Sequence, residues 1–571
     1  MIDYESATSF LDEWGTFQQQ VFFLLCVFIV PNGFISITIV FVADTPAHRC
    51  LIPAHINLTA AWRNSSIPLE EDGSSGTMVP SQCFRYKIDE LLRFSERGLM
   101  PGIDVNLSDV SRESCLDGWE YDRSVYTATI TTEFDLVCDN SWKNPLTSSF
   151  FFCGILVASF ISGQIADRYG RKIVLFVTLA VHSLFIFLQV FANSWAVFCA
   201  LHFVVGMGQI SNYVSAFVLG TELLGPRART IFSTIGANLS CDVGYMLLPL
   251  CAYLLRDWRK LLLCLSLPGF LCLPFWWFIP ESPRWLVSQG RVKEAEAIVR
   301  DIAKRNKIHP PAVIFHSSEK EPPKERKKRS NNICDLLRSR NIRGISLTLW
   351  LVWNSLTIGY YAISLNTSNL YGDVYFNCFL SALVELPAYI LSWVLFRWCS
   401  RRLSVFSSLF ACGVLLLFVQ LIPANLVLLA ITLEMMGKFA VSTAFAFVYA
   451  YTAELYPTVL RNTAIGACST ASRIGSIIAP YFIYLRRYWT SLPYILMGSL
   501  TAVTGLLSLL LPESFGRPLP DTMAQMQHFP GCCQKTAYTV TKTDEENPDV
   551  LNLQVLNEES TRDPVIQHIS S

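Results

Sequence analysis

Long apolar stretches alternate with shorter polar ones along this chain, and twelve of the apolar stretches reach membrane-spanning length. A helix needs about 20 mostly apolar residues to cross the hydrocarbon core of a bilayer. Stretches of this kind lie at residues 20–43, 146–166, 172–192, 195–219, 231–254, 259–279, 343–363, 374–396, 403–421, 426–451, 463–485 and 492–511. They predict an all-α membrane protein with six spans in each half.

The polar segments divide the chain further. A cytosolic N-terminus (1–19) and first span precede a loop of about a hundred residues at 44–145, and the rest of the N-terminal half covers 146–280. A central loop at 281–342 leads to the C-terminal half at 343–511, and a polar tail follows at 512–571. The tail lacks apolar periodicity from about residue 523 onward, so we expect it to be disordered.

Charged residues recur at a fixed distance through this apolar sequence. Three pairs stand 232 positions apart: Glu222 and Glu454, Arg229 and Arg461, and Glu281 and Glu513. The tripeptide Pro-Glu-Ser repeats around the last pair. A fixed offset carried through two sets of six spans indicates one membrane module present twice, which is how a large class of transporters is built.

Composition agrees with a membrane protein and excludes other classes. Hydrophobic residues make up 52% of the 571 residues and charged residues only 16%, well below the roughly 25% of soluble proteins. The net charge is zero and no basic stripe with interleaved aromatic residues is present, so we expect no nucleic-acid partner. The acidic start of the chain lacks the basic region of a signal peptide, so we keep the first apolar stretch as a span.

Lys and Arg in the loops predict the orientation. Residues 291–343 contain fifteen basic and seven acidic residues, including the run at 324–329, whereas residues 44–145 contain nine basic and sixteen acidic ones. The central loop is therefore expected in the cytosol and the 44–145 loop outside the cell. Twelve spans then place both termini in the cytosol, and the lipid bilayer of the plasma membrane is the expected partner.

The external loop has the features of a secreted domain. It contains four cysteines, Cys50, Cys83, Cys115 and Cys138, which predict two disulfides and allow three connectivities. Three glycosylation sequons begin at Asn57, Asn64 and Asn106.

A charged motif joins spans two and three on the expected cytosolic side. Asp167, Arg168 and Arg171 lie in the sequence Asp-Arg-Tyr-Gly-Arg-Lys, and Arg401 lies in a looser counterpart at 397–402. With Glu222, Arg229, Glu454 and Arg461 we expect these residues to form ion-pair networks in both halves. As gates they would hold the outward-facing state and break in the inward-facing one.

These motifs, the segment Pro280–Leu286, the external segment 115–121 and the segments 206–213 and 451–458 resemble the organic cation/carnitine transporters of the major facilitator superfamily. The resemblance covers about residues 3 to 525. It implies a major facilitator fold that moves small organic cations or ammonium zwitterions, with no covalent chemistry.

An arginine within the predicted eleventh span is the first candidate for substrate recognition. An ionisable side chain in a span is costly and is a functional hypothesis by default. Arg473 can bind a carboxylate through two hydrogen bonds, and the resemblance implies that this position holds the carboxylate of carnitine-like zwitterions.

Aromatic faces bind quaternary ammonium groups. Tyr213 in the fourth span, and Phe445, Tyr449 and Tyr451 in the tenth, are the candidates, with Phe445 and Tyr449 on one side of their helix because they are four positions apart.

The possible ligands of a coupling ion form another set. Gln209 and Asn212, which we also count as candidate substrate contacts, join Asn32 and Glu454 as oxygen ligands suited to sodium. The resemblance implies that some members couple carnitine uptake to sodium. We expect no other cofactor, no metal site and no nucleotide, because Gly220–Gly225 lacks the lysine and hydroxyl of a phosphate-binding loop.

Two residues depart from the pattern of the family. Asp242 in span five and Asn354 in span seven are polar where small, aromatic or apolar residues are usual, and both are candidate substrate contacts. An additional acid facing the cavity would favour cations over zwitterions. Glu434 and Lys438, four positions apart in span ten, are expected to neutralise one another.

Two alternatives stay open. Arg473 alone would also suit an organic-anion transporter, and a membrane sensor would bind without transport. An enzyme is not expected, since His182 and His202 stand alone on apolar helices.

Overall fold

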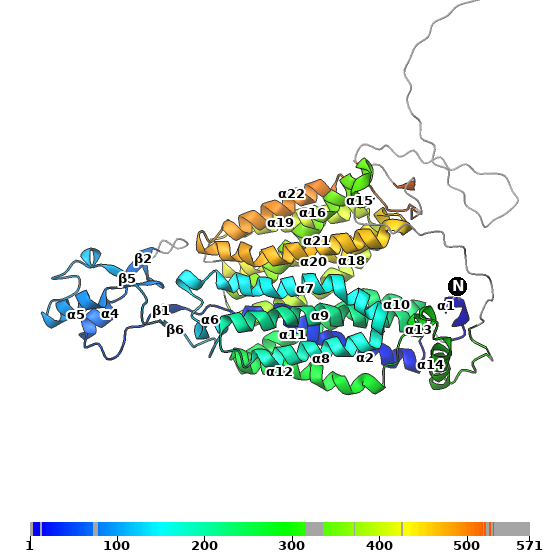
Figure 1. The fold of residues 1–571 in the computed structure, drawn as a ribbon. Helices are drawn as coiled ribbons and strands as arrows, with labels where there is room; N and C mark the ends of the chain where they lie inside the picture. Colours follow the sequence, from blue (N-terminus) through cyan, green and yellow to red (C-terminus); the bar gives the residue numbers. More distant parts are fainter. Residues whose placement is uncertain are drawn as a thin grey trace, which may run out of the picture.

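The computed structural model describes residues 4–529 apart from 12–13, 72–77, 312, 316–334, 371, 424–425, 518, 521–524 and 527–528. It shows a bundle of long helices with a small mixed domain at one end and short helices at the other (Figure 1). We call these the loop end and the α14 end of the bundle. The basic run at 324–329 and the predicted disordered tail beyond residue 529 lie outside the described residues.

Six membrane-length segments form the N-terminal half and coincide with predicted spans one to six. They are α2 (Thr16–Ile37) with α3 (Ile39–Val42), α7 (Lys143–Tyr169), α8 (Arg171–Gln189), α9 (Trp195–Leu223), the run of α10 (Pro226–Ile231), η3 (Phe232–Gly236) and α11 (Ala237–Leu255), and α12 (Trp258–Cys272) with η4 (Leu273–Trp277). One π-helical turn, η3, interrupts the fifth segment.

The C-terminal half repeats this arrangement. Its segments are α16 (Arg340–Leu365) with η5 (Asn366–Asn369), α17 (Val374–Leu383) with α18 (Glu385–Trp398), α19 (Arg401–Val419), α20 (Val427–Leu455), α21 (Thr458–Tyr484) with η6 (Leu485–Arg487), and α22 (Leu492–Ser508). A short helix, α15 (Asp335–Arg338), precedes α16. By length and hydropathy, nine segments among the described residues could cross a membrane, and the other three predicted spans correspond to α16, α21 and α22.

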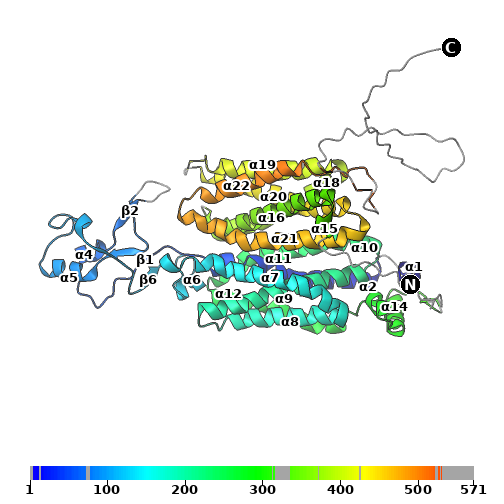
Figure 2. The same ribbon diagram turned by 45° about the horizontal axis from the view of Figure 1, so that its top comes forward.

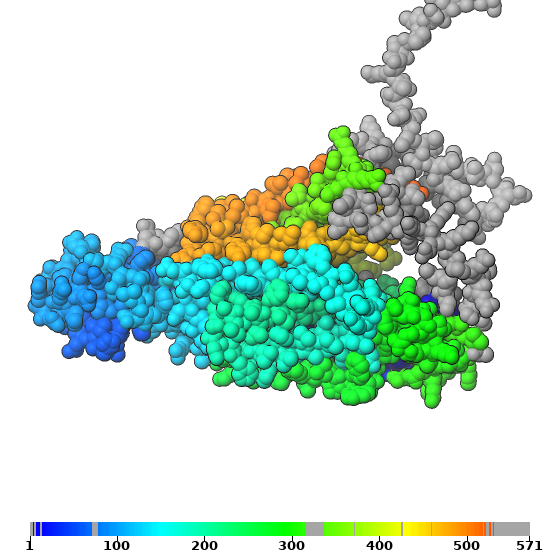
Figure 3. Space-filling view, viewed as in Figure 1, coloured from blue at the N-terminus to red at the C-terminus, as the bar shows by residue number. Residues whose placement is uncertain are grey.

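The two halves lie side by side as two helical layers, as Figure 2 shows. They meet where α7 packs along α21 and α11 packs along α17. Hydrogen bonds cross between the halves toward the loop end: the hydroxyl of Tyr375 donates to the Val125 carbonyl at 3.1 Å, and those of Tyr245 and Ser381 are 3.1 Å apart. Figure 3 shows the surface hollowed between the halves toward the α14 end.

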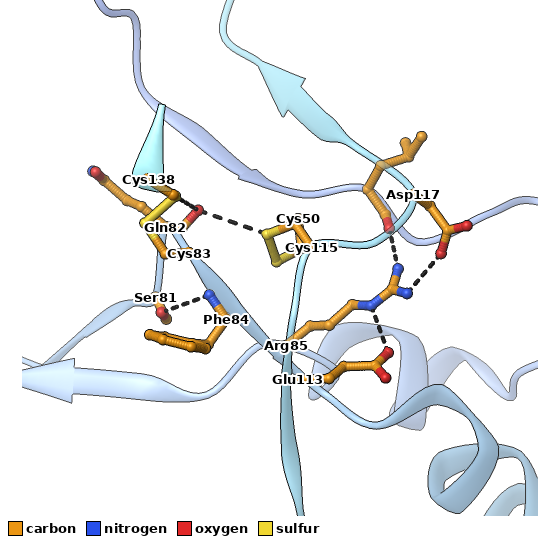
Figure 4. The surroundings of a disulfide bond; sticks show 11 residues. Cys50, Ser81, Gln82, Cys83, Phe84, Arg85, Glu113, Cys115, Asp117 and Cys138 are labelled. Carbon is orange, nitrogen blue, oxygen red and sulfur yellow. Dashed lines mark hydrogen bonds and ion pairs between the residues drawn. A yellow bond between two sulfur atoms is a disulfide. The ribbon is translucent and has the colours of Figure 1, made fainter. Parts of the chain in front are cut away.

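The described residues of the segment 44–142 form most of the domain at the loop end. Its elements are α4 (Ala60–Asn64), α5 (Ile88–Glu96), η1 (Leu107–Asp109), α6 (Ile130–Glu133), η2 (Cys138–Asn140) and three antiparallel strand pairs, β1 (His48–Cys50) with β6 (Trp119–Tyr121), β2 (Leu69–Glu71) with β3 (Met78–Pro80), and β4 (Phe84–Tyr86) with β5 (Arg112–Ser114). The four cysteines form two disulfides, Cys50–Cys115 and Cys83–Cys138, which selects one of the three connectivities (Figure 4).

A buried ion pair stabilises the same domain. The guanidinium of Arg85, which is 2% exposed, lies 2.9 Å from Glu113 and 2.6 Å from Asp117 and donates to the carbonyl of Leu51 at 2.8 Å (Figure 4). All three sequon residues, Asn57, Asn64 and Asn106, are exposed, and the side chain of Asn106 accepts from the backbone N–H of Ser108.

Short helices close the α14 end of the N-terminal half. Two of them, α13 (Pro283–Ser288) and α14 (Val292–Arg305), form an apolar cluster with Ile314 and Phe315. The first helix, α1 (Tyr4–Ala7), packs against this cluster, and its Tyr4 ring stacks on that of Phe315 at 6.0 Å.

Candidate substrate site and charge networks

An ion-pair network stands at the α14 end of the N-terminal half. The Arg171 side chain lies 2.7 Å from Asp167 and 3.3 Å from Glu222. The carboxylate of Glu281 accepts from the backbone N–H groups of Arg171 and Lys172, both at 3.0 Å. Gly170 makes this possible: its φ of +106° allows the turn, and a Cβ there would lie 2.4 Å from Glu281 Oε2.

The C-terminal half contains the matching network. Arg401 lies 3.1 Å from Glu454, and the backbone N–H groups of Arg401 and Arg402 donate to Glu513 at 2.8 and 3.2 Å. The hydroxyl of Ser514 also donates to Glu454 at 2.7 Å. The expected network is therefore present in both halves, in equivalent positions, as duplication requires. Each pair lies within one half, so a latch between the halves stays a prediction.

The other three predicted gating residues are placed differently. Arg168 is exposed and lies over the ring of Tyr169 at 5.6 Å. Arg229 is half-buried on α10. Arg461, near the start of α21, has Nε and one terminal nitrogen buried without a hydrogen-bond partner among the described residues.

Backbone and side-chain hydrogen bonds stabilise the ionised form of Glu513. Burial alone would raise its pKa, but hydrogen bonds from Ser400 and from the backbone N–H groups of Phe515, Arg401 and Arg402 outweigh that effect, so the pKa is lowered. The carboxylate therefore stays ionised at neutral pH.

Arg473 lies midway along α21 and is half-buried. Its Nε is shielded from solvent and has no hydrogen-bond partner among the described residues. Its charge acts on the hydroxyls of Tyr213 on α9 and Tyr361 on α16, so it lies between the two halves. A guanidinium in this position retains donors for a ligand carboxylate.

The aromatic candidates Phe445 and Tyr449 form a cluster on α20. Their rings are 6.0 Å apart, and both contact the buried Trp353, at 6.2 and 4.3 Å. Tyr360 stacks on Phe445 at 5.7 Å. Trp353 and Tyr360 were not among the candidates predicted from the sequence. They are seven positions apart, about two helical turns, which places them on one face of α16, and this spacing could have indicated them.

Three other candidates can be placed relative to this cluster. Tyr213 lies within electrostatic reach of Arg473, Tyr449 and Asp242, so the structure brings these four together. The amide of Asn354 donates to the Trp350 carbonyl at 2.9 Å. Tyr451 is not part of the cluster, because its ring is fully buried and its hydroxyl donates to the Pro512 carbonyl at 2.7 Å.

The predicted ion ligands separate into two places. Gln209 donates to the carbonyl of Asn32 at 2.8 Å, and Asn212 donates to the Asn32 side chain at 3.4 Å. The side-chain oxygens of Gln209 and Asn212 are buried without a hydrogen-bond donor among the described residues. Glu454 lies apart from them, in the network at the α14 end.

A buried network in the C-terminal half corrects one expectation. Lys438 Nζ lies 2.9 Å from Glu385 Oε1, with the two side chains 0% and 1% exposed. The expected Glu434–Lys438 pair is therefore wrong. Glu434 instead accepts from Asn366 at 2.9 Å and Tyr494 at 3.0 Å. Asp242 does not pair with Arg473 but lies beside Glu385.

The duplicated bundle with matching charge networks defines a transporter of the major facilitator type rather than an enzyme. The family model described as sugar (and other) transporter matches residues 113–524. The fold is similar to the inward open conformation of the xylose transporter XylE from E. coli, with a TM-score of 0.54 and 14% identity over 70% of this chain and 93% of that chain. This multi-pass membrane architecture is shared although the sequences have diverged.

Two relatives narrow the class. Organic cation/carnitine transporter 2 of Mus musculus is 54% identical over 96% of this chain and 99% of its own. Solute carrier family 22 member 4 of Mus musculus is 52% identical over 96% of this chain and 99% of its own. The chain therefore belongs to the organic cation/carnitine transporter family.

Proposed function

We propose that this protein transports organic cations and ammonium zwitterions of the carnitine type across the plasma membrane by alternating access, with both termini in the cytosol. The observation that carries the proposal is the half-buried guanidinium of Arg473 beside an aromatic cluster. The guanidinium binds the carboxylate of the substrate, and the faces of Tyr213, Phe445 and Tyr449 bind its trimethylammonium group. The names of the relatives support the same substrate class.

Uptake of a zwitterion, carnitine, and of a cation, tetraethylammonium, by the Arg473→Ala variant tests this assignment. We expect carnitine uptake to be abolished at unchanged surface expression, whereas tetraethylammonium, which has no carboxylate, retains most of its uptake. Equal loss of both substrates would refute the carboxylate role. Uptake of organic anions that exceeds carnitine uptake in the wild type would instead support the organic-anion alternative.

Sodium is the proposed coupling ion. Buried oxygens without a donor call for a ligand, and the Gln209 and Asn212 oxygens beside Asn32 suit a hard cation. We expect carnitine uptake by the wild type to fall when the sodium of the external medium is replaced by lithium, with no choline present. Asn212→Leu removes one ligand and lowers sodium affinity. An unchanged sodium dependence in that variant would place the ion elsewhere.

A further inference from the structure

Two buried acids meet across the interface of the two halves. Asp242 belongs to α11 in the N-terminal half and Glu385 to α18 in the C-terminal half, and their side chains lie next to one another. The exposed fractions of the two residues are 4% and 1%. Two neighbouring carboxylates that are buried to this extent cannot both ionise unless positive charge compensates them.

Lys438 compensates only one of them. Its ammonium contacts Glu385 Oε1 at 2.9 Å and the hydroxyl of Ser364. The two oxygens of Glu385 also accept from the hydroxyl of Tyr360 at 2.9 and 3.2 Å, and Oε2 accepts from Tyr389 at 3.2 Å. Asp242 Oδ2, by contrast, is buried with no hydrogen-bond partner among the described residues.

The electrostatic balance around Asp242 includes the groups on every helix packed near it. Glu385 and Tyr389 from α18 and Lys438 from α20 act on Asp242 directly, and Tyr213 on α9 and Cys241 on α11 lie within its electrostatic reach. Tyr360 and Tyr361 from α16 and Tyr245 from α11 surround Glu385. Cys378 from α17 lies within reach of Lys438 and Tyr245, and Arg473 from α21 within reach of Tyr213 and Tyr361. Of the two bases, Lys438 forms an ion pair with Glu385, whereas no ion pair joins Arg473 to either acid among the described residues. One more positive charge is needed for neutrality.

We propose that Asp242 and Glu385 form a proton-binding site shared by the two halves, and that opening of the loop end is coupled to the loss of this proton. In the present state Asp242 is the protonated partner and Glu385 the ionised one. Opening separates α11 from α18 and hydrates Asp242, which then releases its proton to water. Closing requires that one proton return to the carboxylate. The inference rests on the proposed alternating access.

Linkage gives the size of the effect. If one proton is released on each opening, the ratio of open to closed molecules rises about tenfold per pH unit wherever the closed state holds the proton and the open state does not. Alkaline pH therefore favours the open state and acid pH the closed state.

A distance measurement between the halves tests this on the purified full-length protein in lipid nanodiscs without substrate. Spin-labelled amino acids replace Val197 and Leu429, two exposed residues at equivalent positions 232 apart at the loop end. From pH 6.5 to 8.5 we expect the ratio of open to closed wild-type molecules to rise by about tenfold per pH unit. Asp242→Asn and Glu385→Gln should both flatten this dependence. Glu434→Gln, which changes an equally buried acid with no neighbouring carboxylate, should keep the wild-type slope.

The outcomes separate this inference from the proposed function. The shared proton site is overturned if the open-to-closed ratio of the wild type does not change with pH, or if Asp242→Asn keeps the wild-type pH dependence. In both cases a label pair that shows one distance for the open state and another for the closed state still supports alternating access. A flattened slope in Glu434→Gln overturns it as well. If the label distance never changes, even with carnitine added, then alternating access itself fails.

Discussion

Removal of the lysine that neutralises Glu385 should be among the most damaging single changes in the bundle. Lys438 and Glu385 are fully buried and 2.9 Å apart, so Lys438→Met leaves Glu385 buried as an uncompensated anion. Breaking a buried pair from one side costs about 3–5 kcal/mol, because the remaining charge has lost its partner. We expect the midpoint of thermal unfolding in detergent to fall by about 5 °C or more.

Restoring neutrality should recover most of that loss. In the double variant Lys438→Met with Glu385→Gln, no unpaired charge remains, and a buried pair replaced by neutral groups of similar size is often tolerated. Lys260→Met, an exposed lysine at the start of α12, is the matched control and should change stability by less than about 0.5 kcal/mol. The reasoning fails if Lys438→Met is as stable as this control, or if the double variant is no more stable than the single one.

Three further changes test other parts of the structure. Burial raises the pKa of Asp44, at the loop end, from 3.8 to about 6. Between these pH values the folded state binds more protons than the unfolded one, so stability falls as pH rises through this range. Asp44→Asn should remove this pH dependence of the thermal midpoint, and a dependence that persists would belong to another group. The pKa of Glu513 is lowered, so its contribution to stability is complete above about pH 4.5 and disappears as pH falls through the folded-state pKa. Glu513→Gln should cost roughly 1.5–3 kcal/mol at pH 7, whereas Glu294→Gln, in an exposed ion pair, should leave the thermal midpoint close to the wild-type value. Equal costs of the two substitutions would contradict the role of the hydrogen bonds at Glu513. Arg85→Met leaves two acids of the loop-end domain without their base, and we expect increased cleavage of that domain by trypsin on intact cells; wild-type resistance would show that the disulfides suffice.

The helical spans and the charge networks could be predicted from the sequence because their signals are local or periodic. Span length follows from bilayer thickness, and the offset of 232 appears directly in the chain as Glu222 with Glu454 and Glu281 with Glu513. The structure adds that each acid contacts the turn of its own half.

The partners of buried polar side chains could not be predicted in the same way. The i,i+4 spacing of Glu434 and Lys438 suggested a pair, but helix rotation and packing direct Lys438 toward α18 and Glu434 toward Asn366. The contact of Asp242 with Glu385 depends on how the two halves dock, and no local pattern encodes that. The connectivity of the four cysteines depends on strand pairing in the same way.

The central claim is that Arg473 binds the carboxylate of the substrate, and a binding cycle on the purified protein tests it most directly. Carnitine and its methyl ester, which keeps the ammonium group but has no anionic carboxylate, are titrated against the wild type and Arg473→Ala. We expect the wild type to prefer carnitine by at least tenfold, since a charge-assisted bidentate contact contributes about 1.5–3 kcal/mol, and Arg473→Ala to bind the two ligands with similar affinity. The same preference for carnitine in both proteins would contradict the account.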